Sequence, residues 1–196
     1  MNKKKYTGAI IGAIVLLLLI WLISSYNGLV KKDETVMLQW NEVQNAYQRR
    51  MDLIPNLVNV VKGATDFEQG TLVAVTEARA KAGSIQVSAT TPEAQAYLEQ
   101  AAAQDALAAA ANRLIIAVEK YPELKGAQAF LGLQTQLERT ELRIKMARKD
   151  FNESIATYNQ SVRSFPTKLI AGLLGFSAKE GFKADAGADK ATEIKF

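Results

Sequence analysis

The side chains that most often carry enzyme chemistry are missing from this sequence. Its 196 residues include no histidine and no cysteine. Their absence excludes Ser-His and Cys-His nucleophile pairs, ordinary zinc sites and the Glu-x-x-His ligands of di-iron bundles. The sequence also has no G-x-x-x-x-G-K-[ST] loop to hold a phosphate. We therefore predict that the protein is not an enzyme and has no catalytic, cofactor-binding or metal-binding residues.

Two pairs of acidic residues have the spacing that places both carboxylates on one helix face. Glu138 and Glu141 are three positions apart, and so are Asp150 and Glu153. Either pair has the geometry to touch a cation. Solvated charges on an exposed helix face explain the same spacing more simply, so we interpret all four residues as surface charges.

A charged cluster in front of a proline is the most distinctive polar feature. Arg49, Arg50 and Asp52 are followed by Pro55. Proline lacks an amide donor and clashes with the preceding turn, so we expect one helix to end here and another to begin. With Asp52 as N-cap, Pro55 falls in the first turn of the new helix, and both arginines lie at the negative end of the previous one. The cluster is either a ligand or partner site at a bundle tip or ordinary capping and charge pairing.

Apolar residues at intervals of three and four predict four long helices that position this cluster. Short breaks between them favour antiparallel neighbours. The predicted fold is therefore all-α: an N-terminal transmembrane helix followed by an antiparallel four-helix up-and-down bundle with long helices. Thr91 and Pro92 should open the third helix as N-cap and first residue. The expected helices are 29–50, 53–82, 91–120 and 127–165.

The start of the chain has the length and composition of a membrane anchor. Residues 6–30 carry no charge, and as a helix they would extend about 37 Å, enough to cross a hydrocarbon core about 30 Å thick. A cleaved signal peptide is the alternative, but residues 24–27 lack an A-x-A-like cleavage site. Gly28 leaves both a rigid stalk and a flexible elbow open after the anchor.

The lysines on either side of the anchor suggest its orientation. Lys3, Lys4 and Lys5 precede it, and only Lys31 and Lys32 follow closely. This excess favours a cytoplasmic N-terminus. We predict a single-pass protein of the inner, or cytoplasmic, membrane whose C-terminal domain is periplasmic or extracellular.

Composition divides the rest of the chain and limits its partners. We expect a basic tail at 1–5, the anchor at 6–30, a helical bundle domain at 31–176 and a tail at 177–196 that is disordered apart from Phe182. Removing the three N-terminal lysines from 24 basic residues leaves 21 against 20 acidic ones. A nearly neutral domain gives no electrostatic case for nucleic-acid binding.

An apolar segment follows Pro166 and is too short to span a membrane. Four antiparallel helices would return the chain towards the bilayer, so we expect this segment to lie at the headgroups or between neighbouring copies. Alternatively, it plugs the open end of its own bundle. The candidate residues are Leu169, Ile170, Leu173, Leu174 and Phe176.

Several motifs resemble those of the LemA family, in order and at its distances. They are Tyr26-Asn27-x-Leu29-Val30, Trp40-x-x-Val43, Tyr121-Pro122-x-Leu124-Lys125 and, most specific, the run from Arg49 to Val58. This run adds Asn56 to the candidate interaction residues. The chain departs from the family at Phe67, where histidine is frequent, and at Ala64, where an aromatic is usual. The resemblance implies a membrane-anchored antiparallel helical bundle and supplies no catalytic residues.

These observations predict an anchored, extracytoplasmic scaffold or interaction protein. Its expected partners are the lipid bilayer, further copies of itself as a homo-oligomer and another envelope protein. The alternative is a ligand-sensing or cargo-binding bundle that holds an apolar molecule between its helices.

Overall fold

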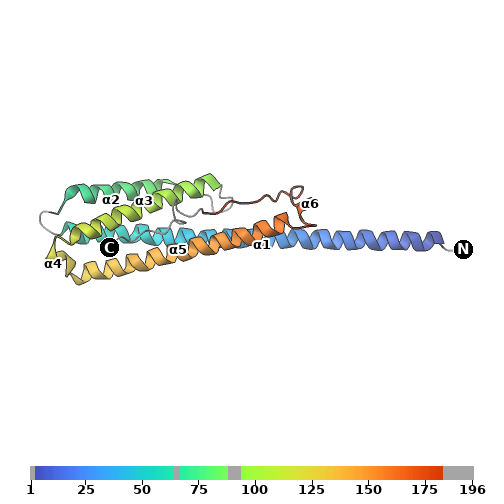
Figure 1. The fold of residues 1–196 in the computed structure, drawn as a ribbon, viewed down its shortest axis with the longest axis horizontal. Helices are drawn as coiled ribbons and strands as arrows, with labels where there is room; N and C mark the ends of the chain where they lie inside the picture. Colours follow the sequence, from blue (N-terminus) through green and yellow to red (C-terminus); the bar gives the residue numbers. More distant parts are fainter. Residues whose placement is uncertain (1–2, 64–66, 88–93, 183–196) are drawn as a thin grey trace, which may run out of the picture.

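The computed structural model describes residues 3–63, 67–87 and 94–182. Within these ranges the chain forms six helices and no strand. The long helices lie side by side along the length of the molecule, and α1 extends well beyond the others towards the N-terminus (Figure 1). The prediction of an all-α chain with an apolar N-terminal helix is confirmed. The helices are α1 Lys3–Lys62, α2 Gln69–Ser84, α3 Ala94–Val118, α4 Pro122–Lys125, α5 Gln128–Arg163 and α6 Lys168–Ala171.

Helix α1 continues through Pro55, so the predicted reversal at this proline is wrong. A proline inside a helix costs about 3 kcal/mol, whereas full burial of one large aliphatic side chain gains about 1.5–3 kcal/mol. Four buried side chains flank the proline, and together they outweigh its cost. The helix therefore ends only at Lys62. The four flanking residues are Leu53, Ile54, Leu57 and Val58.

The predicted helix cap at Asp52 and the position of the first chain reversal are also wrong, because α1 does not end at Pro55. Asp52 lies in the middle of α1 and caps no helix; its carboxylate accepts a hydrogen bond from Gln48 at 2.7 Å. The first reversal instead falls between Lys62 and the start of α2 at Gln69. The predicted cap and first residue of the third helix, Thr91 and Pro92, lie outside the described residues.

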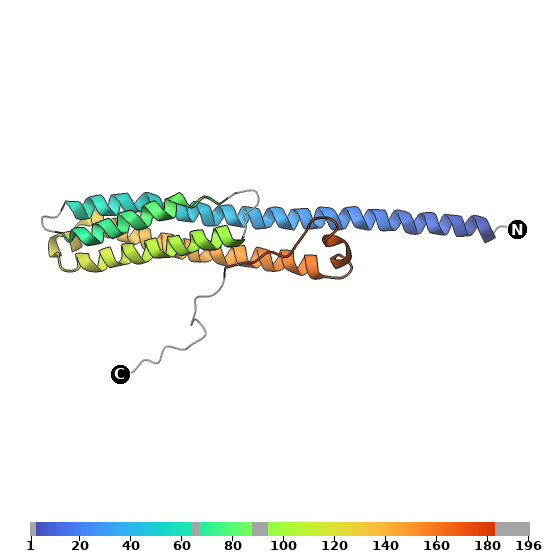
Figure 2. The ribbon, with the colours of Figure 1, turned by 90° about the horizontal axis from the view of Figure 1, so that it is seen from above.

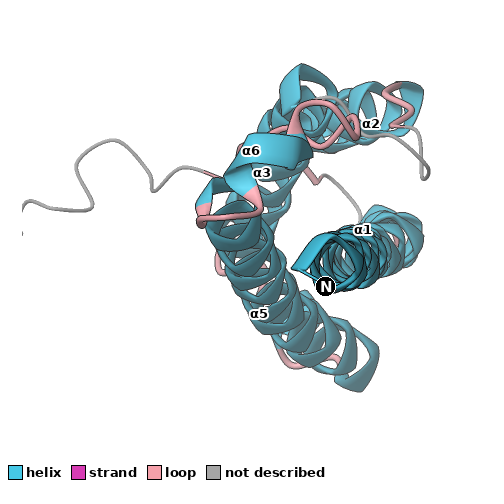
Figure 3. Cartoon of the chain, turned by 90° about the vertical axis from the view of Figure 1, so that its right-hand side faces the viewer, coloured by secondary structure: helices cyan, strands magenta, loops and turns pink. Residues whose placement is uncertain are grey.

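Because α1 is continuous, a rigid stalk and not a flexible elbow follows the apolar N-terminal part. Gly28 lies inside the helix, and the same helix carries both the apolar N-terminal part and the buried residues of the helical domain. Viewed along the length of the molecule, α2, α3 and α5 form an arc around one side of α1 (Figure 3). The apolar part and the helical domain are thus joined by a straight stalk.

The buried residues form two separate clusters along this axis. The distal core joins the end of α1 to α2, α3, α4 and the start of α5, and it is mainly aliphatic. The proximal core lies nearer to the apolar start of α1. It joins residues 29–47 of α1 to residues 144–162 of α5, with Tyr97 of α3 and Ala171 of α6.

The C-terminal end of the described chain turns back along the domain (Figure 2). After α6, residues 177–182 lie against α5 and form hydrogen bonds with Asn152 and Asn159. We call residues 177–182 the C-terminal strap. The disorder predicted for 177–196 therefore does not apply to these six residues, and 183–196 lie outside the described part.

Candidate functional site

The N-terminal part of α1 is suited to a membrane. Among the described residues, α1 and α3 are both long and apolar enough to cross one, by length and composition alone. In α3, 44% of the most apolar stretch is buried inside the protein, compared with 0% in α1. The alanine-rich α3 is a core helix, which leaves α1 as the segment able to enter a bilayer.

The predicted apolar segment lies beside the point where the uncharged part of α1 ends. The Phe176 ring meets the Tyr26 ring edge-on, with centroids 5.7 Å apart. Ile170, Leu174 and Phe176 are half-buried. Leu169 and Leu173 remain 67% and 87% exposed. The segment therefore partly covers its own domain and also presents two leucines outward.

The predicted cluster around Arg50 does not gather at a tip. Arg50 is only 1% exposed and lies in the middle of the domain. One of its terminal nitrogens donates to the backbone carbonyl oxygen of Gln104 at 2.6 Å, and the other pairs with a Glu141 carboxylate oxygen at 2.5 Å. The guanidinium thereby ties together α1, α3 and α5. Arg49, Asp52 and Asn56 are exposed, and Pro55 is half-buried.

Glu141 was interpreted as a surface charge, which misses this role, although its side chain is 42% exposed. Gln104 carries the signal that was available: it lies within the apolar stripe of α3, three positions before Leu107. A polar residue at such a position needs a buried partner. Sequence alone does not show which helix supplies it.

A groove of about 310 Å³ lies beside Arg50, between α3 and α5. Its apolar walls include Ala111, Ile115 and Leu137, and it also contains the carboxylates of Glu138 and Glu141. Within the described residues, Arg50 Nε has no hydrogen-bond partner and no group of three metal-binding side chains comes together. The two carboxylates and the guanidinium do not favour a purely apolar ligand in this groove.

The C-terminal strap is bound by two asparagines of α5. The amide nitrogen of Lys179 donates to Asn159 Oδ1 at 2.8 Å, and Asn159 Nδ2 donates to the Lys179 carbonyl oxygen at 2.7 Å. Asn152 does the same with Phe182, at 2.8 and 3.0 Å. Each carboxamide thus satisfies both backbone groups of one strap residue, as a neighbouring β-strand would.

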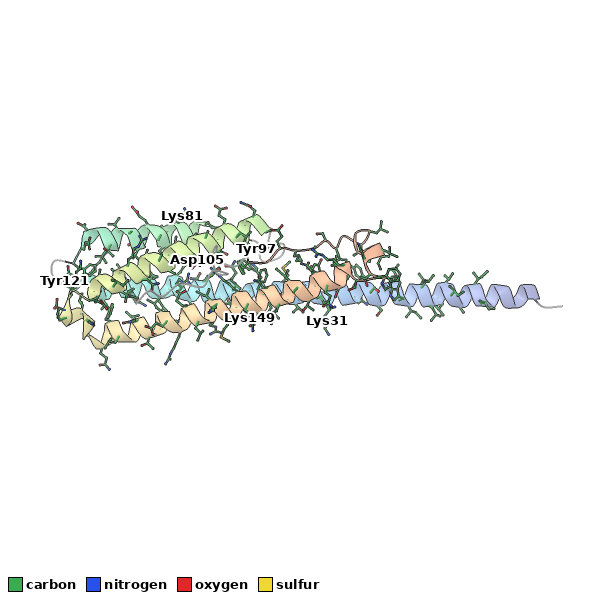
Figure 4. The ribbon with its side chains drawn as sticks, viewed as in Figure 1. Lys31, Lys81, Tyr97, Asp105, Tyr121 and Lys149 are labelled. Carbon is green, nitrogen blue, oxygen red and sulfur yellow. The ribbon has the colours of Figure 1, made fainter. Side chains whose placement is uncertain are left out.

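Phe182 fills an aromatic site at the centre of the proximal core. Its ring centroid lies 5.4 Å from that of Phe151, 5.7 Å from Tyr97 and 6.3 Å from Trp40. The Tyr97 hydroxyl donates to the Glu180 carbonyl oxygen. Tyr97 lies where the strap meets α3 (Figure 4). Burial, with a smaller effect of the Glu180 charge, raises the pKa of Tyr97 to about 12.

Two cations flank this aromatic site. Arg148 pairs with Asp105 at 2.7 Å, donates to the Tyr47 hydroxyl at 2.8 Å and lies 5.3 Å from the Phe182 ring centroid. Burial raises the pKa of Tyr47, although the Arg148 charge opposes the shift. These contacts link α1, α3, α5 and the strap.

Lys179 makes the second set of charged contacts. Its ammonium pairs with Asp33 at 2.9 Å and lies 5.4 Å from the Tyr158 ring centroid. Burial and the Asp33 charge raise the pKa of Tyr158. The sequence-based prediction missed this entire site, because it took the strap to be disordered.

These features define a class: an all-α protein whose N-terminal helix is apolar enough to enter a membrane and runs without a break into a helical domain. The sequence pattern of the LemA family matches residues 39–196, and the chain belongs to this family.

Two kinds of relative support this assignment. The chain is 26% identical over 149 residues to Protein LemA of Metamycoplasma hominis, a match that covers 72% of this chain and 64% of that protein. It is 35% identical over 80 residues to Magnetosome protein MamQ of Magnetospirillum gryphiswaldense, covering 41% of this chain and 29% of that protein. The chain thus spans just under two thirds of the first relative and less than a third of the second.

Proposed function

We propose that this protein is a membrane-anchored scaffold or interaction protein. In this proposal, the start of α1 crosses the membrane with its N-terminus in the cytoplasm. An antiparallel four-helix up-and-down bundle stands on the other side. The observation that carries the proposal is the unbroken α1, which runs from Lys3 to Lys62. One helix then serves as anchor, stalk and core element.

This arrangement suits a protein that works through contacts. A continuous helix fixes the height and orientation of the domain relative to the bilayer, so copies in one membrane present the same surface at the same level. Confinement to a plane raises the effective concentration, and weak contacts then suffice for assembly. The proposed partners are further copies of the chain and another envelope protein.

The exposed leucines beside the stalk support a contact near the membrane. Leu169 and Leu173 project from the segment that packs against Tyr26, and Phe165 nearby is 81% exposed. Apolar side chains at this level are stabilised by headgroup-level lipid or by a neighbouring copy. Membership of the LemA family agrees with a role at the membrane.

Purification of the full-length protein from membranes, with mass measurement of the intact assembly in detergent and in nanodiscs, tests the proposal. We expect assemblies of several copies or a stoichiometric envelope partner. Leu169→Ser with Leu173→Ser should reduce assembly. Leu142→Ser is the matched control, because Leu142 is similarly exposed on α5, far from this end. A monomer without partners at micromolar concentration in both media would contradict the proposal.

The orientation has a separate test. Protease added outside spheroplasts should remove the helical domain if residues from Lys31 onward are extracytoplasmic. Protection of the domain, together with cleavage of the N-terminus, would reverse the assignment.

A further inference from the structure

We propose that the face of α5 around Asn152 and Asn159, with the adjoining surfaces of α1 and α3, is a peptide-recognition groove. Its ligand is an extended segment of a partner protein in which a lysine precedes a glycine-aromatic pair by one intervening residue. The strap occupies this groove in cis and competes with the partner.

The two asparagines have the spacing that an extended peptide requires. Asn152 and Asn159 are seven residues apart on one helix, which corresponds to a rise of about 10.5 Å. The residues that they bind, Lys179 and Phe182, are three positions apart, and in an extended segment of the polyproline II type, which repeats every three residues, their backbone groups point to the same side about 9 Å apart. A rigid helix and an extended segment are therefore in register at both positions.

The hydrogen bonds from these asparagines read the backbone and not the side chains. Each one engages the N–H and C=O groups of the same residue. Any extended segment offers these groups, and main-chain pairing of this kind is how many proteins gain affinity for extended peptides. The clamp is consequently not restricted to the strap's own sequence.

Specificity comes from three positions of the ligand. The first is a cation, which Asp33 and the Tyr158 ring receive. The second is a glycine: a Cβ at Gly181 would lie 2.6 Å from Asn152 Oδ1, so any other residue would displace the carboxamide that binds Phe182. The third is an aromatic ring, which packs against Trp40, Tyr97 and Phe151. The residue between the cation and the glycine, Glu180, is exposed and free to vary.

The strap fits this groove incompletely. Lys179, Gly181 and Phe182 are only half-buried. Trp40 is fully buried, yet its indole Nε1 has no acceptor within the described residues. A buried donor without an acceptor is unfavourable, because it has lost its hydrogen bond to water and gained none in return. A partner segment that supplies this acceptor would bind more tightly than the strap does.

This incomplete fit also favours a different protein over a second copy as the ligand. The strap is joined to α6 by only a few residues, so its effective concentration at its own groove is on the order of millimolar or higher. An identical strap from another copy makes only the same contacts and cannot overcome this concentration advantage. A segment that makes additional contacts can overcome it.

Peptide binding to the full-length chain in detergent tests the inference. The probe is a fluorescently labelled peptide with the sequence of residues 177–182 and blocked ends, followed by anisotropy. Gly181→Val with Phe182→Ser releases the strap and leaves the groove residues unchanged. This variant should bind the probe at least tenfold more tightly than the wild type. Ala178→Ser, at an exposed strap position, should leave the wild-type affinity unchanged.

Two further variants make the readout specific. Adding Asn152→Ala and Asn159→Ala to the released chain should weaken probe binding at least tenfold. Lys179→Ala alone removes the Asp33 ion pair and the contact with the Tyr158 ring, so it should raise the affinity of the full chain for the probe by about threefold. Because this change leaves Phe182 in place, it remains informative if full release of the strap unfolds the domain.

Two results would overturn the inference. Folded variants, checked by circular dichroism, that bind the probe no better than a scrambled peptide would exclude a recognition groove. A stable dimer of wild-type chains that Gly181→Val with Phe182→Ser abolishes would show that a second copy is the ligand.

The inference rests on the proposed function only in treating the helical domain as an interaction module. Probe binding in detergent does not require anchoring or assembly. Loss of assembly with intact probe binding would therefore count against the proposed function alone, and the converse result would count against the groove alone.

Discussion

In the distal core, α2 and α3 cover the buried face of α1, whereas in the proximal core α1 and α5 have few helical neighbours and residues 172–182 cover them. Figures 1 and 2 show α2 and α3 beside only the later part of α1. The distal core is built mainly from aliphatic side chains. The proximal core contains Trp40, Tyr47, Tyr97, Phe151 and Tyr158.

The difference follows from geometry. Two packed helices leave one side of their contact open, and large rings cover more open surface per residue than aliphatic side chains do. Phe176 and Phe182 supply the remaining cover from beyond α6. The proximal half therefore depends on a segment that lies outside the regular helices.

Trp40→Ala should cause the largest loss of stability and should also release the strap. Truncation of a buried tryptophan costs about 3–5 kcal/mol, and here it also removes a ring against which Phe182 packs. Leu114→Ala in the distal core should cost about 2–5 kcal/mol and leave the strap in place. Urea unfolding measures both losses, and proteolysis of the C-terminal end reports strap release. Equal strap release in both variants would contradict the separation of the cores.

Phe182→Ala tests whether the strap stabilises the proximal core. Half-burial of the ring is worth about half the value for a fully buried side chain, and its aromatic pairs add about 0.5–1.5 kcal/mol, so its loss should cost about 1.5–3 kcal/mol of unfolding free energy. Phe165→Ala is the matched control, because that ring is 81% exposed and its removal should change stability by less than about 0.5 kcal/mol. Similar melting temperatures for the two variants would mean that the strap does not cover the proximal core.

The two arginine networks offer a smaller contrast. Glu141→Ala leaves the buried Arg50 without its carboxylate, which should cost about 1–3 kcal/mol. Asp105→Ala removes the partner of Arg148, where the carboxylate is 51% exposed and the loss should stay below about 1 kcal/mol. Urea denaturation of both variants checks the order. A larger loss for Asp105→Ala would reverse this ranking.

The last expected effect is a pH dependence of the proximal core, which appears only above about pH 10. The pKa of Tyr97 is raised from 10.0 to about 12, so the folded state retains its proton more strongly than the unfolded chain does. The resulting stability is complete below about pH 10 and is lost as the pH rises towards 12. Melting temperatures should therefore fall more steeply over this window for the wild type than for Tyr97→Phe. Parallel curves would contradict the assigned burial of Tyr97.

Sequence reasoning located most helices because apolar periodicity is a local property. It correctly placed breaks near Ser84 and around Pro122. It failed at Pro55, where a local rule about proline was outweighed by burial against helices that arrive later in the chain.

The strap was missed for a related reason. Residues 177–182 are small or charged except for one phenylalanine, a composition that is typical of disorder. Their order comes from Asn152 and Asn159, about twenty to thirty residues earlier, which look like ordinary surface amides when each is read alone. Their seven-residue spacing, which places both on one face of α5, was the one available signal.

Hydrogen exchange of the strap amides shows directly whether the strap completes the proximal core. The amides of Lys179 and Phe182 donate to Asn159 and Asn152, so both should be protected in the full-length wild type. The amide of Glu180, which makes no such bond within the described residues, should exchange faster. Asn152→Ala with Asn159→Ala should abolish the protection. Exchange of all three amides at the rate of an unstructured peptide would contradict a proximal core that is completed by the strap.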